Sequence, residues 1–161
     1  MEIKGAYLVA ATRETVWMAL NDPAILQRCL PGCETLEKQS ETAFSATIKT
    51  KIGPVSARFT GTVTLENLDP PNSYRIVGEG QGGVAGFAKG SASVVLRDDG
   101  NGTMLSYDAD AKIGGKLAQI GSRLVAGTIR KLAEEFFRRF AETVAPGLAA
   151  EKVVAQGSNP S

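Results

Sequence analysis

The feature that most constrains the fold of this chain is a change of hydrophobic period at Gly114-Gly115. Between residues 35 and 113, apolar and polar residues alternate, which is typical of antiparallel strands with one dry face and one wet face. From about residue 116 to residue 145, apolar residues recur every three or four positions, which predicts one long amphipathic helix. At about 1.5 Å per residue this helix is roughly 45 Å long, so the sheet must curve around it to bury its apolar stripe.

The residues before the alternating region predict one strand and two short helices. The strand runs to Ala10, and Thr12 suits the N-cap of a first helix that ends near Asn21. Asp22-Pro23 supplies the N-cap and the first-turn proline of a second helix, which Pro31-Gly32 ends. The sequence therefore predicts an α+β fold, in which a curved antiparallel sheet of about seven strands wraps around a long C-terminal helix.

The length of 161 residues predicts a single compact domain, here assigned to residues 1–145. A chain of this size buries roughly 70% of its unfolded surface, so its core needs no metal or disulfide. Residues 146–161 hold too few apolar side chains to form a core, and we expect a flexible tail there. The apolar positions expected to face the sheet from the long helix are Leu117, Ile120, Leu124, Leu132, Phe136, Phe140 and Val144.

The composition excludes several kinds of site. The chain has no histidine, so it cannot form a Ser-His or Cys-His nucleophile pair or a histidine-ligated metal site. Cys29 and Cys33 cannot fill a four-thiolate site, and whether they form a disulfide is left open. The sequence Gly78-x-Gly80-x-x-Gly83 is followed by a strand pattern, not by the helix that a dinucleotide site needs. We therefore expect neither a metal nor a cofactor.

The charge balance excludes a strong general attraction to polyanions. The chain has 18 Lys and Arg residues against 17 Asp and Glu residues, a formal net charge of +1, so nucleic acid is not an expected partner. No secretory signal and no apolar run long enough to span a bilayer are found in the sequence. The expected location is the cytoplasm; peripheral association with the inner face of the cell membrane and formation of a homodimer are left open.

A gradient of side-chain size along the inward face of the sheet indicates a cavity. One end of the sheet carries large residues, whereas the other end and the start of the long helix carry mostly small ones. If these small-residue surfaces do not touch, an apolar space of the kind that binds small molecules remains between them. Close backbone contact is the alternative. The small inward residues of the sheet are Ala57, Gly78, Gly80, Ala88, Gly90, Ala109 and Ala111.

This cavity predicts a module that binds a hydrophobic small molecule. Trp17, Leu20 and Leu26 on the short helices are expected to close its mouth. Residues of the sheet, including Phe87 and Ala109, and residues of the long helix complete the predicted site. The predicted ligand-binding residues are Trp17, Leu20, Leu26, Phe59, Phe87, Ala109, Ile113, Leu117, Ile120 and Leu124.

An enzyme is the alternative from another class, and it requires polar groups that face inward. Tyr107 is the only good candidate from the alternation, and its hydroxyl, with an ordinary pKa near 10, is a poor base at neutral pH. We therefore predict no catalytic residue. A docking factor with a fully packed interior is the third hypothesis.

Several short strings, in this order and spacing, carry a resemblance to a known family. The strings are Val16-Trp17 with Leu20-Asn21-Asp22-Pro23, Cys29-Leu30-Pro31-Gly32-Cys33-Glu34, Ile52-Gly53-Pro54-Val55 with Phe59 and Gly61, Gly102-Thr103 with Leu105 and Tyr107, and Gly114-Gly115-Lys116-Leu117-Ala118 with Gly121-Ser122-Arg123-Leu124. Over residues 1 to about 145 the chain resembles the family of the carbon monoxide dehydrogenase G subunit, within the START-like (SRPBCC) superfamily of helix-grip proteins.

The resemblance implies a function that agrees with the predicted cavity. It implies a non-catalytic accessory protein for molybdenum-containing hydroxylases of the carbon monoxide dehydrogenase type. Such a protein recruits the enzyme to the membrane or carries a hydrophobic quinone or lipid. Other START-like proteins are cyclases or hydrolases, which is what the enzyme alternative would mean for this chain.

Overall fold

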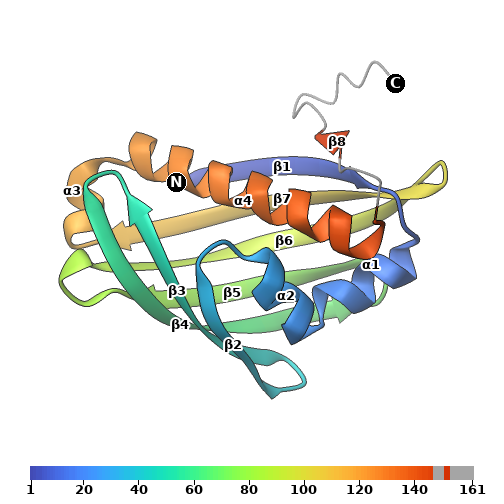
Figure 1. The fold of residues 1–161 in the computed structure, drawn as a ribbon, viewed down its shortest axis with the longest axis horizontal. Helices are drawn as coiled ribbons and strands as arrows, with labels where there is room; N and C mark the ends of the chain where they lie inside the picture. Colours follow the sequence, from blue (N-terminus) through green and yellow to red (C-terminus); the bar gives the residue numbers. More distant parts are fainter. Residues whose placement is uncertain (147–150, 153–161) are drawn as a thin grey trace.

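The computed structural model describes residues 1–146 and 151–152 of the chain. Most of the predicted flexible tail, residues 146–161, lies outside the described residues. The predicted α+β fold is confirmed: one antiparallel sheet follows the chain, with two short helices after its first strand and a long helix near the C-terminus (Figure 1). The strands are β1 (Glu2–Val9), β2 (Cys33–Ser40), β3 (Ala43–Ile52), β4 (Val55–Asp69), β5 (Ser73–Gln81), β6 (Phe87–Asp99), β7 (Gly102–Gly114) and the two-residue β8 (Glu151–Lys152).

The two short helices begin where the sequence predicts. Helix α1 (Arg13–Leu20) is capped by Thr12, whose side chain accepts a hydrogen bond from the backbone N–H of Thr15 at 3.2 Å. Helix α2 (Pro23–Cys29) is capped by Asp22, whose carboxylate accepts one from the N–H of Ala24 at 3.0 Å. Both caps satisfy N–H groups that the first turn of a helix leaves without partners.

The prediction of one continuous helix from residue 116 to residue 145 is wrong. The chain forms a short helix, α3 (Lys116–Ile120), and then α4 (Ser122–Val144). Gly121 separates them with a φ of +100°, a backbone conformation that side-chain-bearing residues rarely adopt. The break shifts the apolar stripe, so that Val125 is 1% exposed whereas Leu124, predicted to face inward, is 47% exposed.

The sheet bends so that strands near both of its edges reach α4. Its strand order is β2-β3-β4-β5-β6-β7-β1-β8, and α4 contacts β1 and β3 as well as α2. Figure 1 shows α4 lying along the sheet, between β1 on one side and the β2–β3 edge on the other. The helix therefore bridges the mouth of a curved sheet whose middle strands, β4 to β6, form its floor.

The interior holds two separate hydrophobic clusters. The larger, which we call the main core, joins α1, α2 and the second half of α4 to the large-residue end of the sheet, and Phe140, 0% exposed, is one of its members. The smaller, which we call the end core, lies where α3 meets the turns at the opposite end. Its buried residues are Ile52, Leu117 and Val125, with Met1, Val55, Phe59, Ile113, Ile120 and Ile129 packed against them.

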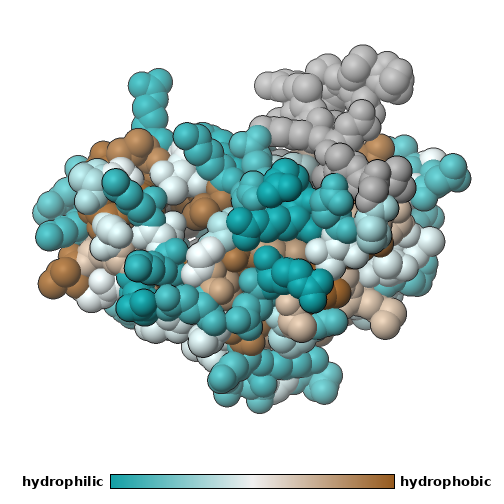
Figure 2. Space-filling view, in the orientation of Figure 1, coloured by the Kyte–Doolittle hydropathy of each residue, from teal (hydrophilic) through white to brown (hydrophobic). Residues whose placement is uncertain are grey.

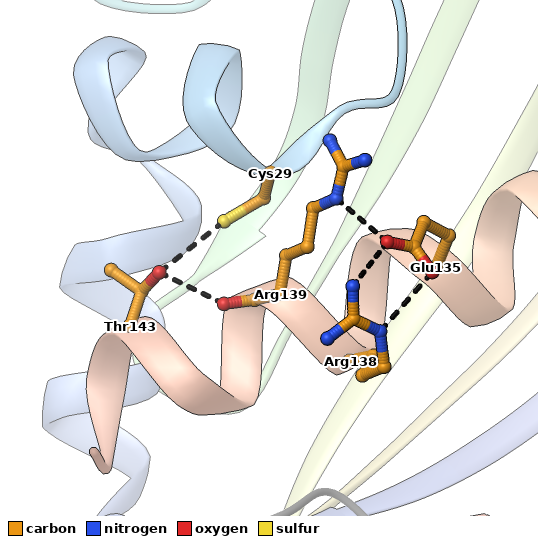
Figure 3. Close-up of polar contacts among 5 residues, drawn as sticks. All are labelled: Cys29, Glu135, Arg138, Arg139 and Thr143. Atoms are coloured by element: carbon orange, nitrogen blue, oxygen red, sulfur yellow. Dashed lines mark hydrogen bonds and ion pairs between the residues drawn. The ribbon is translucent and has the colours of Figure 1, made fainter.

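A chain of polar contacts attaches α2 to α4 inside this arrangement (Figure 3). The Cys29 Sγ lies 3.7 Å from the Thr143 Oγ1, and that hydroxyl donates a hydrogen bond of 2.8 Å to the Arg139 carbonyl oxygen. The Arg139 Nε donates to Glu135 at 2.8 Å, and Arg138 holds the same carboxylate. Both Cys29 and Cys33 are free thiols, which answers the question of a disulfide that the sequence leaves open.

Replacing Phe140 with alanine is expected to lower the free energy of unfolding by about 3–5 kcal/mol, because a fully buried ring would leave a cavity in the main core. Met18→Ala is the control, since Met18 is 73% exposed and its loss should change stability by less than about 0.5 kcal/mol. Urea unfolding followed by circular dichroism measures both. Equal small losses in the two variants would contradict the assignment of Phe140 to the main core.

Stability is also expected to fall at alkaline pH through Tyr7. Its ring stacks on Phe137 with centroids 4.3 Å apart, and burial, with smaller effects from Tyr107 and Glu134, raises the pKa of Tyr7 to about 12. The folded state thus favours the neutral phenol, so its contribution to stability is complete below pH about 10 and is lost as the pH rises through 12.

Urea midpoints measured from pH 8 to pH 12 test this linkage, with Tyr7→Phe as the comparison. The variant is expected to lose less stability over the upper part of that range than the unmodified protein, because it has no phenol to ionise at this position. Parallel declines of the two proteins would show that Tyr7 does not contribute.

Candidate functional site

An apolar pocket of about 270 Å³ lies on the inner face of the sheet. It is formed by the middle strands β3 to β7, at the end of the sheet where the sequence places small residues. The pocket therefore lies over the floor of the curved sheet. The residues that supply its inner surface are Ala46, Ile48, Phe59, Gly61, Val63, Gly78, Gly80, Ala88, Gly90 and Ala111.

The register of the strands brings these small residues side by side. Gly61 pairs with Gly80, Gly80 with Ala88, and Gly78 with Gly90, which in turn pairs with Ala111. Neighbouring strands thus place a glycine or an alanine opposite one another at the same level. The backbone itself forms much of the pocket floor, so space is left where large side chains would otherwise stand.

The burial pattern along single strands supports the same description. In β5 the inward Tyr74 is 6% exposed, whereas the inward Ile76, Gly78 and Gly80 are half-buried. In β4 the inward residues are likewise half-buried until Leu65, which is 7% exposed. The inner face is therefore closed by the main core at one end and stays open to a molecule at the other.

A second, larger hollow of about 460 Å³ lies on the outer face of the same strands. Its lining includes the charged residues Arg75, Glu79, Lys89, Asp110 and Lys112, which alternate with the inward positions. Gly78, Gly90 and Ala111 contribute to both hollows, so one layer of backbone separates them. The outer hollow is lined by charged and polar side chains, whereas the inner pocket is almost entirely apolar, and both are open to solvent.

The ten residues predicted to bind a ligand fall into five places. Phe59 lines the inner pocket, and Ile113, Leu117 and Ile120 belong to the end core beside it. Trp17, Leu20 and Leu26 form part of the main core, where Trp17 packs edge-on against Tyr74 at 5.2 Å. Ala109 is a half-buried residue of β7, and the exposed pair is Phe87 and Leu124.

The prediction favoured large apolar side chains, and this explains the residues that it missed. The pocket floor consists largely of glycine and alanine, including Ala88 and Ala111, whose positions the size gradient already marked. Ala46 and Ile48 on β3 were missed altogether. Their signal is the pairing register, since Ala46 lies opposite Gly61 and Ile48 opposite Phe59. A pocket that exists because its floor lacks large side chains is recognised in a sequence by its small residues, not by its large ones.

Tyr107 is the titratable side chain that the sequence analysis names as the candidate for a catalytic group. It faces inward, and its ring stacks on Phe137 with centroids 6.0 Å apart. Burial raises the pKa of Tyr107, which the nearby Arg130 lowers and Glu134 raises further. The hydroxyl thus stays protonated at neutral pH, where it can donate or accept a hydrogen bond but cannot act as an anionic base.

The described part of the chain offers neither a cluster of metal ligands nor a membrane-spanning helix. No group of three or more His, Cys, Asp or Glu residues there is placed to hold a metal ion. None of the helices in those residues is long and apolar enough to cross a membrane.

Comparison with solved structures places the fold. A conserved protein from Geobacillus kaustophilus matches with a TM-score of 0.84 and 29% identity, over 94% of this chain and 99% of that one. A protein from Chromobacterium violaceum matches with a TM-score of 0.69 and 15% identity, over 90% and 98% of the two chains. Ara h 8.0201 matches with a TM-score of 0.63 and 10% identity, over 89% and 97%. The distant matches show that the fold is START-like.

The family follows from the sequence itself. A search of curated proteins found no match. The model of the family described as the G subunit of carbon monoxide dehydrogenase (CoxG) matches residues 5–145, which include every strand and helix from β1 to α4 except the first residues of β1. The chain therefore belongs to the CoxG family, an accessory subunit family linked to the carbon monoxide dehydrogenase system.

Proposed function

We propose that this protein is a non-catalytic carrier that holds a quinone- or lipid-like molecule in the inner pocket and serves a molybdenum hydroxylase of the carbon monoxide dehydrogenase type. The observation that carries the proposal is the apolar pocket on the inner face of the sheet. It lies between two separate hydrophobic clusters, and no side chain of α4 lines it. In this proposal the protein works at the inner face of the cell membrane, where such a ligand is available.

The lining selects an apolar ligand. Thr60, Thr62, Glu79 and Lys89 border the pocket, but by the strand alternation their side chains belong to the outer face. A ligand in the pocket thus meets methyl groups, the Phe59 ring and glycine backbone, and its affinity comes from apolar surface removed from water.

The pocket volume limits how much of the ligand can be enclosed. About 270 Å³ is just below the usual range for small-molecule sites. The pocket is therefore proposed to hold a ring or a stretch of chain, while the remainder of a long prenyl or acyl tail stays outside it.

The alternatives receive less support. A cyclase or hydrolase of the START-like type needs an ionisable group in the pocket, and Tyr107 is held in its neutral form by burial. A docking factor with a packed interior would bury the inward side chains along the whole of β4 and β5, yet most of them are only half-buried. Membership of the CoxG family supports the accessory role over the enzyme.

Larger side chains on the pocket floor are expected to fill the pocket and abolish ligand uptake while preserving the fold. Gly80 is the most suitable position, because a Cβ there would lie 3.7 Å from the Thr60 carbonyl oxygen, an ordinary contact. Gly80→Leu and Ala111→Phe should each weaken binding of a short-chain ubiquinone by tenfold or more, measured by quenching of Trp17 fluorescence. Gly90→Phe is unsuitable, since its Cβ would already lie 2.3 Å from the Asp110 carbonyl oxygen.

The matched controls add the same side chains outside the pocket. A Cβ at Gly127 on α4 would have no heavy atom within 4 Å, and Ala118 on α3 is exposed. Gly127→Leu and Ala118→Phe should bind the quinone as the unmodified protein does. Undiminished binding by both pocket variants would overturn the assignment of the site.

Material bound during expression gives a second, independent check. Organic extraction of the purified protein, followed by mass spectrometry, should yield a quinone or another lipid in near-stoichiometric amount, and the Gly80→Leu protein should yield little. If the unmodified protein repeatedly yields none but co-purifies with a molybdenum hydroxylase, the docking role replaces the carrier role.

A further inference from the structure

The turns at one end of the molecule, which we call the cationic end, carry only positive charges. These turns are the β3–β4, β5–β6 and β7–α4 connections, residues 51–56, 81–89 and 112–124. They contain no Asp or Glu. Their charged residues are Lys51, Lys89, Lys112, Lys116 and Arg123, all exposed.

These cations lack close ion-pair partners in the described part of the chain. None of the five forms an ion pair within residues 1–146 and 151–152. Lys89 and Lys112 even lie directly opposite one another on β6 and β7, an arrangement that is unfavourable in isolation. Of the nearest carboxylates on the strands, Asp110 pairs with the N-terminal ammonium at 3.3 Å; Glu79 lies across from Lys89 and Glu2 lies at the start of β1.

Exposed apolar side chains stand among these charges. Val84 at the tip of the β5–β6 connection is 85% exposed, Leu124 at the start of α4 is 47% exposed, and Phe87 is 39% exposed. Figure 2 shows hydrophobic and hydrophilic residues side by side at the left end of the molecule, where α3 lies in Figure 1.

The three connections form one continuous surface. A Cβ at Gly53 would lie 2.7 Å from the Leu124 Cδ2, and one at Gly86 would lie 2.0 Å from the Gly114 carbonyl oxygen. The β3–β4 turn therefore touches α4, and the β5–β6 connection touches the end of β7. Val84 and the surrounding cations therefore belong to one surface.

The turns at the opposite end of the sheet carry acidic residues, two of which are ion-paired: Asp98 with Arg13 and Glu41 with Lys38. These turns, residues 40–43, 69–73 and 98–102, contain Glu41, Asp69, Asp98 and Asp99 and no Lys or Arg. The net charge of +1 thus hides a separation of charge along the length of the strands. A protein with this distribution turns its cationic end toward any anionic surface.

We propose that the cationic end docks on an anionic lipid bilayer, with Val84, Phe87 and Leu124 entering the interface beneath the lipid phosphates. This proposal rests on the proposed function only in assuming that the protein acts at a membrane. It does not depend on which ligand the pocket holds. Cations around exposed aliphatic and aromatic groups match the layered chemistry of a bilayer surface, in which phosphates overlie hydrocarbon.

The docking face also adjoins the pocket. The connection that carries Val84 joins β5 to β6, and the pocket residues Gly80 and Ala88 lie at the ends of those strands. A Cβ at Gly82 in this connection would lie 2.4 Å from the ring of the pocket residue Phe59. A bilayer at this end is therefore next to the pocket, which shortens the path of an apolar ligand through water.

Vesicle sedimentation with the full chain tests the surface. The unmodified protein should bind vesicles of phosphatidylcholine and phosphatidylglycerol in equal parts, bind pure phosphatidylcholine vesicles weakly, and lose binding at high salt. Each cation near such a surface contributes about fivefold in partitioning, so removing four should weaken binding by at least a hundredfold. The test variant combines Lys51→Gln, Lys112→Gln, Lys116→Gln and Arg123→Gln.

A variant with the same net charge is the control. It removes four cations from elsewhere on the molecule, and it should lose far less binding than the test variant. The control combines Lys38→Gln, Arg97→Gln, Arg130→Gln and Lys131→Gln. Equal loss in both variants would show that only net charge matters and would overturn the proposed surface.

Tryptophan emission tests insertion. Val84→Trp should shift its emission to shorter wavelength on anionic vesicles, whereas Met18→Trp, on the exposed side of α1, should not. The reverse result, or no shift for Val84→Trp despite binding, would contradict docking through this end. If the unmodified protein binds no vesicles, the bilayer proposal is wrong.

The quinone-binding assay separates the two proposals. The test variant should still bind the short-chain ubiquinone in solution, because none of its four changes lies in the pocket. Lost vesicle binding with retained ubiquinone binding supports the surface, whereas vesicle binding without ubiquinone binding would leave the surface standing and overturn the carrier role.

Discussion

The burial of α4 is the constraint on which the rest of the structure depends. A 23-residue amphipathic helix must cover its apolar stripe, and here strands from both sides of one sheet provide the cover. A sheet that bends far enough to meet the helix at β1 and β3 carries its middle strands away from it. The hollow over β4 to β6 is thus a consequence of how the helix is held, and the small residues of those strands preserve it.

Two hydrophobic clusters, one on each side of the hollow, hold the helices in place, and the space between them is left for a ligand. The main core, with Phe140 and the aromatic stack of Tyr7 on Phe137, fixes the position of the second half of α4. The end core fastens α3 to the turns through Leu117. Between them, glycine and alanine at paired positions leave apolar space, and no buried side-chain N or O atom of the described residues lacks a hydrogen-bond partner. This arrangement is compatible with the accessory role of the CoxG family and with the carrier role proposed here.

The charged residues of the turns are distributed unequally between the two ends of the sheet. Acidic turns lie at the main-core end and basic turns at the end-core end, where the pocket also lies. The same strand ends therefore bring together a hollow for an apolar ligand and a surface suited to anionic lipid. Because antiparallel strands return every second turn to the same end, charges far apart in the sequence gather on one face.

The sequence by itself determined the class of fold, the order of its elements and the helix starts, because alternation, capping by Thr12 and Asp22, and the prolines act locally. It also marked the small-residue end of the sheet through the alternation of Gly78, Gly80 and Ala88. It did not determine the break at Gly121, since one glycine in a periodic stripe is compatible with a continuous helix. Only the tertiary structure decided which residues line the pocket and that five cations meet at one end. Both depend on strand register and sheet curvature, which are set by contacts between residues distant in the chain, and no local pattern records them.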